Sequence, residues 1–256
     1  RDWSSDVCSS DLQLLAALTS DHLAAKLCNV VDTGNREDAY TGIYQSICNA
    51  VSNNGGINRD DTKQAIMTAF YSSKAVPKQV FGEGALLDVF YEVLSTVAPA
   101  AWELNEAMLA MWNPNALSHD WVLPDNFHVH VKVMNQTKER AQFLQHPVDV
   151  FYKVNEPMEQ GRSLGANTIH SIDGMIVREL TRRCDYEPRK IEYVSSLLSN
   201  GDKGGKQILS KDDQLVVKLW DHYKRTGYLS ARILDHLNGK NIGHVDKSEI
   251  SDLIGS

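Results

Sequence analysis

The sequence predicts a mostly helical α+β fold with one small β-hairpin. Long stretches in which apolar residues recur at helical spacing support the helices, and a short stretch at 119–134, in which valines alternate with polar residues, supports the hairpin. Of the 256 residues, 42% are hydrophobic and 23% are charged, which is ordinary for a soluble globular protein. This length accommodates one large domain or two smaller ones.

The first helix is expected at 13–31, a stretch rich in leucine and alanine. The preceding segment, RDWSSDVCSSDL at 1–12, resembles the translated read-through of a sequencing adaptor, so native sequence is expected from Gln13 onwards. A turn at 32–38 separates the first helix from a second one, expected from about Ala39 to Val51.

The next helix, at 59–72, carries four unlike side chains at intervals of four: Arg59, Lys63, Met67 and Tyr71. Each lies about 40° round the helix from the last, so together they form one slowly winding face that climbs roughly 18 Å. We call this face the stripe. Asn58 is expected to cap the helix, with Asp60 and Asp61 in its first turn. The inward side is expected to carry Ile66, Ala69 and Phe70.

The stripe is cationic at its N-terminal end and aromatic at its C-terminal end. Such a face suits an extended nucleoside triphosphate, because cations contact the phosphates and a ring contacts the sugar and base. An amphipathic helix with solvated cations and a buried methionine and tyrosine explains the same spacing. The spacing alone leaves both interpretations open.

A long helical pattern follows at 83–112, in which Pro99 is expected to break or kink the helix. In the strand that comes next, His128 and His130 are expected on the exposed face of a hairpin, with the turn at LPDN. Two histidines at this spacing can share a metal, with His119 or Asp125 as a third ligand, although nothing in the pattern requires it.

The C-terminal part is expected to begin as a loop at 161 and to become helical near Asp173. Arg178, Arg182 and Arg183 form a basic patch that suits either a phosphate backbone or solvent. Several short helices are predicted at 187–256. Two of them begin with capping-box patterns, Ser210-x-x-Asp213 and Asp246-x-x-Glu249.

Composition narrows the functional classes. The net charge of −7 argues against a simple nucleic-acid-binding protein, but this charge is concentrated at 83–160, away from the stripe. Beyond residue 12, Cys28, Cys48 and Cys184 are widely spaced and suggest neither a zinc ribbon nor a disulfide framework. A reducing cytoplasm is the simplest setting. No apolar run approaches the length of a membrane span, and no secretory signal pattern is recognised, so no membrane partner is expected.

Five segments, in order, resemble single-subunit DNA-directed RNA polymerases of the bacteriophage and mitochondrial type. The fingers helix of that family has the form Arg-x3-Lys-x3-Met-Thr-x2-Tyr, which the stripe matches. Gln13 and the helix after it resemble the end of the first palm motif, and Asp38-x-Tyr40 resembles the entry to the fingers. WVLPDNF at 121–127 resembles the family's Trp-Val-x-Pro-Asp-x-Phe hairpin, and HSIDG at 170–174 resembles its His-Ser-x-Asp-Gly motif.

The resemblance covers about 13–184 and implies part of a right-hand polymerase fold. It implies a palm helix at 13–33, the fingers at 34–170, and a palm segment with a helical insertion at 171–256. The implied partners are a DNA template, the RNA product and ribonucleoside triphosphates, in the cytoplasm of a phage-infected bacterial host.

The resemblance also implies roles for the stripe. Lys63 would contact the triphosphate and help to protonate the leaving pyrophosphate, and Arg59 would bind the phosphates. Tyr71 would help to select ribose over deoxyribose, with His170 near the same sugar. Met67 would line the nucleotide pocket. The reaction implied is in-line phosphoryl transfer with two Mg²⁺ ions.

This sequence departs from the family pattern in two ways. Ser72 stands where the family usually has glycine. Neither metal-binding aspartate is recognised. The first is expected in an Asp-x4-Gly just before Gln13 and the second in a His-Asp pair after Ser256, so the Mg²⁺ ligands are expected outside this chain. The chain alone is therefore not expected to polymerise nucleotides.

Three alternatives stay open at this point. Family-A DNA polymerases share the Arg-x3-Lys and tyrosine frame, but they usually lack the methionine and the His-Ser-x-Asp-Gly motif. A non-catalytic nucleic-acid-binding subunit of a split polymerase, partnered by a second polymerase subunit, is a different class. A purely structural helical protein is the third.

Overall fold

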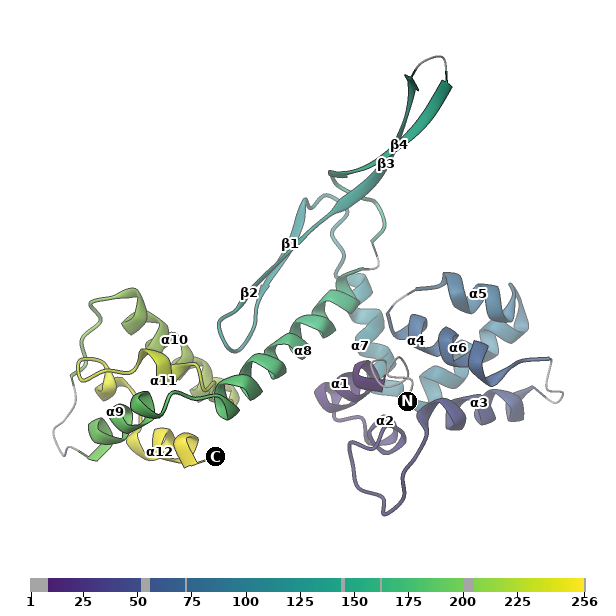
Figure 1. The fold of residues 1–256 in the computed structure, drawn as a ribbon. Coiled ribbons are helices and arrows are strands. Elements are labelled where there is room, and N and C mark those ends of the chain that lie inside the picture. The colour runs from purple at the N-terminus through teal and green to yellow at the C-terminus, as the bar shows by residue number, and fades with distance from the viewer. Residues whose placement is uncertain are drawn as a thin grey trace. The chain divides into compact units, whose positions relative to one another are not determined.

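The structure is a computed structural model that describes residues 9–51, 56–71, 73–143, 146–161, 163–199 and 205–255. The chain divides into two compact units (Figure 1). The first unit comprises 1–119 and 132–169, and the second comprises 120–131 and 170–256. The described part is mostly helical with two small antiparallel sheets, so the predicted α+β, mostly helical class is confirmed.

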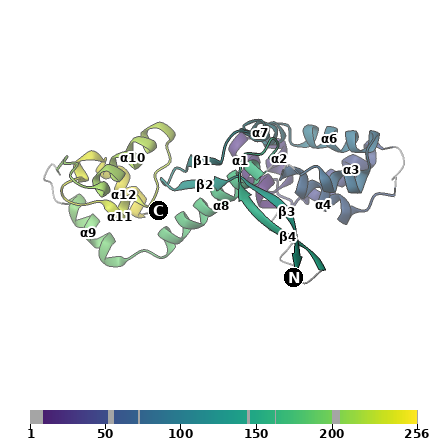
Figure 2. The same ribbon diagram turned by 90° about the horizontal axis from the view of Figure 1, so that it is seen from above.

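The first unit is built from helices around one apolar core. They are α1 (Ser9–Thr19), α2 (His22–Leu27), α3 (Ala39–Ala50), α4 (Arg59–Phe70), α5 (Ala75–Phe81), α6 (Ala85–Val97) and α7 (Pro99–Ala110). Helix α3 packs against both α4 and α6, as Figures 1 and 2 show. Fully buried side chains at the centre of this core include Leu15, Ile43, Ile47, Ile66, Phe90 and Leu94. Their burial provides the main driving force for this unit to fold.

The single helix predicted at 13–31 is wrong, because α1 and α2 are separate helices. The chain turns at Ser20, whose φ is +54°, and Asp21 then starts α2. One oxygen of the buried Asp21 carboxylate accepts from two backbone N–H groups of α2. The other oxygen accepts from the backbone N–H groups of Ala100 and Ala101 at the start of α7, at 3.0 and 3.2 Å. One carboxylate thus satisfies the first turns of two helices.

Part of the segment set aside as non-native is ordered into this unit. Ser9 to Leu12 form the first turn of α1, and Leu12 is 4% exposed within the core. Residues 1–8 lie outside the described residues.

Pro99 breaks the long helical pattern, as predicted. Helices α6 and α7 meet at Ala98 and are bent by 114°. Among the described residues, no single helix is long and apolar enough to cross a membrane. Helices α6 and α7 meet both criteria only when they are counted as one segment, and the bend separates them.

The predicted hairpin is present as β1 (Ser118–Val122) and β2 (His128–Lys132). Its turn closes at Asn126, which has a φ of +56°, and the Leu123 N–H donates to the Phe127 carbonyl. His128 and His130 lie on the exposed face, as predicted.

A second hairpin was not predicted. Strands β3 (Met134–Phe143) and β4 (His146–Asn155) pair antiparallel from Met134 opposite Asn155 to Phe143 opposite His146. Almost all of β4 is exposed on both faces, although Val148, Val150, Tyr152 and Val154 recur at alternate positions.

The second unit contains several short helices around its own core, which confirms the prediction for 187–256. Its helices are most of α8 (Ser163–Cys184), then α9 (Pro188–Ser199), α10 (Lys211–Thr226), α11 (Ile233–His236), the 3-10 helix η2 (Ile242–His244) and α12 (Lys247–Gly255). Ser210 and Asp213 form the predicted capping box at the start of α10. The expectation of a loop before Asp173 is wrong, because α8 is helical from Ser163. The NGDKGG pattern at 200–205 predicts a surface loop, but it lies largely outside the described residues, which omit 200–204.

Candidate nucleotide site

Helix α4 forms where the sequence predicts it. The Asn58 side chain accepts the N–H of Asp60 at 3.1 Å and so caps the first turn, as expected. Ile66, Ala69 and Phe70 are buried on the inward side. All four stripe residues, Arg59, Lys63, Met67 and Tyr71, are half-buried. The stripe therefore runs along the border between the core and solvent, which neither of the two initial interpretations described.

Arg59 is held in place by the start of α3. Its Nη2 donates to Asp38 Oδ2 over 2.5 Å, and its Nε donates to Thr41 Oγ1 over 2.9 Å. Asp38 also caps α3 by accepting the Thr41 N–H. Burial opposes ionisation of Asp38, but the hydrogen bonds from Thr41 and the charge of Arg59 outweigh it and hold its pKa below the ordinary value. Asp38 is therefore a carboxylate already bound to a cation.

Lys63 lies one turn further along the stripe. Its Nζ is 5.3 Å from the centroid of the Tyr40 ring, a cation–π contact. Tyr40 belongs to α3, so both cations of the stripe contact the same neighbouring helix. The ammonium group of Lys63 is oriented by this ring and keeps its charge available to an anion.

These residues line a cavity of about 410 Å³ within the first unit. This volume lies within the range of small-molecule sites. Three cations, Arg36, Arg59 and Lys63, face it with two acids, Glu37 and Asp38. The remaining lining residues are Gln13, Leu27, Cys28, Asn29, Ala39 and Tyr40. The cavity thus has a small excess of positive charge, as an anion-binding site requires.

Cys28 does not supply a nucleophile to this cavity. Burial raises the pKa of its thiol to about 11, and its Sγ donates to the Ala24 carbonyl at 2.8 Å. Gln13 is fixed beside it, because its Nε2 donates to the Cys28 carbonyl at 2.8 Å. The polar chemistry of the cavity is therefore that of the cations, not of the thiol.

The other predicted site residues do not line this cavity. Met67 and Tyr71 continue the same face of α4 beyond it, and Tyr71 is the residue at which the helix ends. His170 belongs to the second unit, where it is exposed on α8. The structure therefore brings Arg59 and Lys63 together with Gln13, Asp38 and Tyr40 in the first unit.

Two further segments of the resemblance lie side by side in the second unit. Trp121 Nε1 donates to Ser171 Oγ at 3.1 Å, which joins WVLPDNF to HSIDG. Asp125 of the hairpin turn accepts from Arg178 Nε at 2.8 Å, and the Arg178 guanidinium stacks 4.1 Å from the centroid of the Phe127 ring. Both contacts fix the hairpin turn against α8.

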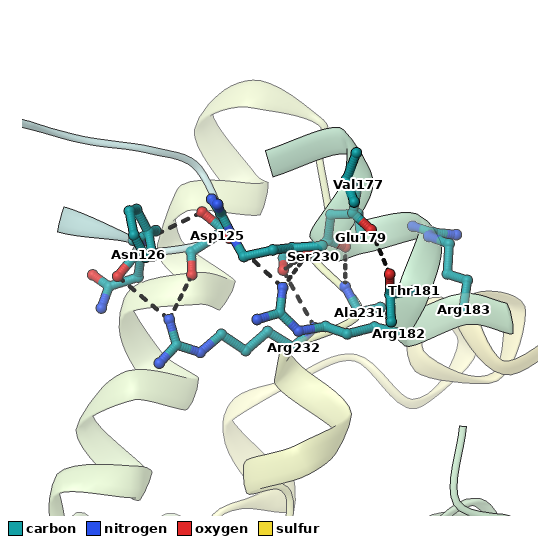
Figure 3. Close-up of polar contacts among 12 residues, drawn as sticks. Asp125, Asn126, Val177, Glu179, Thr181, Arg182, Arg183, Ser230, Ala231 and Arg232 are labelled. Atoms are coloured by element: carbon teal, nitrogen blue, oxygen red, sulfur yellow. Dashed lines mark hydrogen bonds and ion pairs between the residues drawn. The ribbon is translucent and has the colours of Figure 1, made fainter. Parts of the chain in front are cut away.

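The basic patch on α8 therefore differs from both expectations. Arg178 and Arg182 are ion-paired with the fully buried Asp125, so they neither project into solvent nor present a free surface for phosphates. Figure 3 shows Asp125 and Arg182 in this network. Arg182 also pairs with Glu179, whose carboxylate accepts from Ser230 and from the backbone of Ala231. Only Arg183, of the three arginines, is exposed.

Asp125 is ionised despite its burial. Burial raises its pKa, but the hydrogen bond and charge of Arg178, the Phe127 N–H and the charge of Arg182 outweigh it and hold the pKa below the ordinary value of 3.8. It is consequently a structural anion and is committed to its arginine partners, which removes it as a third metal ligand beside the histidines.

The described residues do not fit a magnesium site. Among them, no group of three or more histidine, cysteine, aspartate or glutamate side chains could hold a metal ion. His130 pairs with Asp120, and Asp38 in the cavity is bound to Arg59. Cations outnumber acids among the charged side chains of the cavity, and cationic side chains repel a divalent metal ion.

Sequence reasoning missed the parts of the cavity that hold the stripe in place. Thr41 both binds Arg59 and donates from Oγ1 to Asp38 Oδ2 at 2.7 Å. Asp38 is a favourable N-cap residue, which is a local signal for the start of α3 but gives no sign of the contact with Arg59. Arg36, in the turn before α3, carries no local signal of a role.

Comparison with protein-family models and with curated proteins gives no match for this chain.

Proposed function

We propose that this chain is the nucleotide-binding middle portion of a single-subunit DNA-directed RNA polymerase. The observation that carries the proposal is the shared cavity of the first unit. Gln13, Asp38-x-Tyr40 and the stripe come from three separate segments that the resemblance singles out, and all three contribute to its lining. Side chains chosen for their motif positions would not be expected to meet in one cavity if the motifs had arisen by chance.

The charge of this cavity suits a triphosphate. Arg59 uses one N–H of Nη2 and its Nε–H for Asp38 and Thr41, and a guanidinium carries five N–H donors in all. Its Nη1 also lies 3.6 Å from Asp60 Oδ1, so the guanidinium is held between two carboxylates, and its remaining N–H donors are the ones that a phosphate could use. Lys63 adds a second, mobile cation from one helical turn further along.

In this proposal the residues of the chain bind and orient the nucleotide. Arg59 binds the phosphates, and Lys63 contacts the triphosphate and donates a proton to the pyrophosphate as it leaves. Met67 and Tyr71 lie along the direction in which the sugar and base extend, with His170 as a further contact to the sugar. The Mg²⁺ ions of such a reaction would be held by carboxylates outside the described residues.

The parent protein would act on a DNA template and ribonucleoside triphosphates in the cytoplasm of a phage-infected bacterial host. If it is split between polypeptides, a second polymerase subunit completes it. In the fold this implies, 13–33 are a palm helix, 34–170 the fingers, and 171–256 a palm segment with a helical insertion.

Titration with a fluorescent ribonucleoside triphosphate tests the nucleotide site. We expect the full chain to bind it, and Lys63→Ala to weaken binding by roughly tenfold or more, the value of one hydrogen bond to a charged group. Lys78→Ala is the matched control, because Lys78 is an exposed lysine of the same unit that pairs with Glu83 away from the cavity.

Equal affinities for Lys63→Ala and Lys78→Ala would contradict the assignment of the site. Thermal unfolding of both variants checks that neither has lost the fold. Primer extension by the purified 256-residue chain would separately refute the proposal that this portion is incomplete.

A further inference from the structure

A groove of about 820 Å³ in the second unit lies between the β1–β2 turn and α10. One wall comes from the turn and β2, with Val122, Leu123, Pro124, Asn126 and His128, and the other comes from α10, with Lys218, Leu219, Asp221, His222, Lys224 and Arg225. The α10 wall belongs to the predicted insertion, for which the sequence indicates no role. We call it the α10 groove.

The charge of the α10 groove is locally positive. Lys218, Lys224 and Arg225 face it with one acid, Asp221. Asp221 pairs with Lys224 over 3.3 Å, so the charges of Lys218 and Arg225 are not offset by an acid of the groove. These two side chains lie seven residues apart on one helix, which places them on one face about 10 Å from each other. That separation suits successive phosphates of a strand better than a single phosphate ion.

The opposite wall is apolar and rigid. Val122 is 54% exposed beside Pro124, and His128 is exposed on the strand that leaves the turn. The turn is anchored from beneath, because Arg232 Nη1 donates to the Asp125 carbonyl at 2.9 Å and Asp125 is itself ion-paired with α8 (Figure 3). An apolar wall with an imidazole ring offers a surface for sugars and bases opposite a cationic wall for phosphates.

One polar atom of the groove lacks a partner. Among the described residues, His222 Nε2 is buried without a hydrogen-bond partner, although His222 lines the groove. A buried imidazole nitrogen without a partner is costly, but Nε2 is closed off from solvent, so a ligand in the groove would reach it only if the His222 side chain turned toward the groove.

We propose that the α10 groove binds a single strand of nucleic acid, with Lys218 and Arg225 contacting its phosphates. A single strand offers its unpaired bases as well as its phosphates to the two walls, whereas a duplex offers mainly its phosphates. The inference does not depend on the nucleotide site, because every residue in it belongs to the second unit.

Fluorescence anisotropy with a labelled oligothymidylate of about twelve nucleotides tests the groove, over 50 to 200 mM salt. Lys218→Ala/Arg225→Ala should weaken binding by the full chain roughly tenfold at the lowest salt and reduce the slope of log K against log salt by about 1.4, the value for two phosphate contacts to a single strand. Lys211→Ala/Lys240→Ala is the control, since it removes two exposed cations of the same unit that do not line the groove.

Several results would overturn the inference. One is that the two double variants have equal effects, or that the chain binds no strand at the lowest salt. Another is that a duplex binds as strongly as the single strand, or that polyglutamate competes for the chain as strongly as the strand does. Loss of strand binding in Lys63→Ala would also overturn it, because it would place the strand in the first unit. Unchanged strand binding in Lys63→Ala, whatever its triphosphate affinity, supports the groove and keeps the two proposals distinguishable.

Discussion

Arg178 donates a hydrogen bond from Nε to the Asp125 carboxylate over 2.8 Å, and the Asp125 side chain is completely buried. The two residues are 53 positions apart: Asp125 belongs to WVLPDNF, and Arg178 belongs to α8, the helix that contains HSIDG. Asp125 of WVLPDNF therefore holds α8, which carries HSIDG, against the hairpin turn. Its role in this chain is structural, and the cationic groove beside it depends on that role.

Replacing Asp125 with asparagine should destabilise the second unit by about 3 kcal/mol. The change leaves Arg178 and Arg182 beside a site from which their counter-charge has been removed, and a half-buried cation without its partner is costly. Urea unfolding followed by fluorescence, together with hydrogen exchange at the Ala231 amide, measures the effect. Asp235→Asn is the control, because Asp235 is exposed on α11 of the same unit. Equal midpoints for both variants would show that the ion pair contributes nothing.

The contribution of Asp125 should depend on pH in a defined direction. Its pKa in the folded protein lies below the ordinary value of 3.8, so its stabilisation is fully present above that value and is lost as the pH falls through the lower, folded value. The difference in urea midpoint between the wild type and Asp125→Asn should therefore be constant near neutral pH and shrink below 3.8. A difference that grew on acidification would contradict the assignment of Asp125 as the ionised partner.

The capping box of α10 offers a graded test of the same unit. Asp213 Oδ2 accepts from the backbone of Leu209 and Ser210, and its Oδ1 accepts from the side chains of Asn238 and Asn241 at 3.2 and 2.7 Å. Ser210→Ala should cost about 1 kcal/mol, the usual value of an N-cap. Asp213→Ala should cost more, because it also removes one of the acceptors of each of two asparagine side chains. Thermal unfolding measures both costs. A larger loss of stability in Ser210→Ala than in Asp213→Ala would contradict this prediction.

Tyr71 should contribute to the choice between ribose and deoxyribose if the first unit binds nucleotides as proposed. Tyr71→Phe keeps the ring at the end of α4 but removes the hydroxyl, so the ratio of affinities for a ribonucleoside and a deoxyribonucleoside triphosphate should fall by about fivefold, the value of one hydrogen bond. Competition titrations measure the ratio. Tyr186→Phe, an exposed tyrosine of the second unit, is the control. An unchanged ratio would remove Tyr71 from sugar recognition.

Local signals in the sequence predicted α4 well. Asn58 as a cap, two acids in the first turn and buried residues on one side all lie within a dozen residues, and each is a short-range effect. The start of α8 was missed because Gly165, Asn167 and Thr168 are poor helix formers. There the burial of Leu164 and Ile169 provides tertiary packing that outweighs local propensity.

The cavity and the ion pairs depend on contacts between distant segments. Arg59 and Asp38 are 21 residues apart, and nothing local in either segment indicates that they meet. The second hairpin was missed although β4 places Val148, Val150, Tyr152 and Val154 at alternate positions, because its partner β3 is mostly polar and shows no such pattern. The sequence thus indicated the residue types of the candidate site, but it did not indicate the partners that hold them.

The central proposal, that this chain is part of an RNA polymerase, is tested most directly by determining the coding sequence on both sides of residues 13–256. We expect one open reading frame that encodes an Asp-x4-Gly motif just before Gln13 and a His-Asp pair after Ser256, which together would supply the metal-binding carboxylates. A start codon near Gln13, or a stop codon after Ser256 with no His-Asp pair encoded elsewhere, would contradict it. The cavity around Arg59 and Lys63 would then be an anion-binding site without polymerase chemistry.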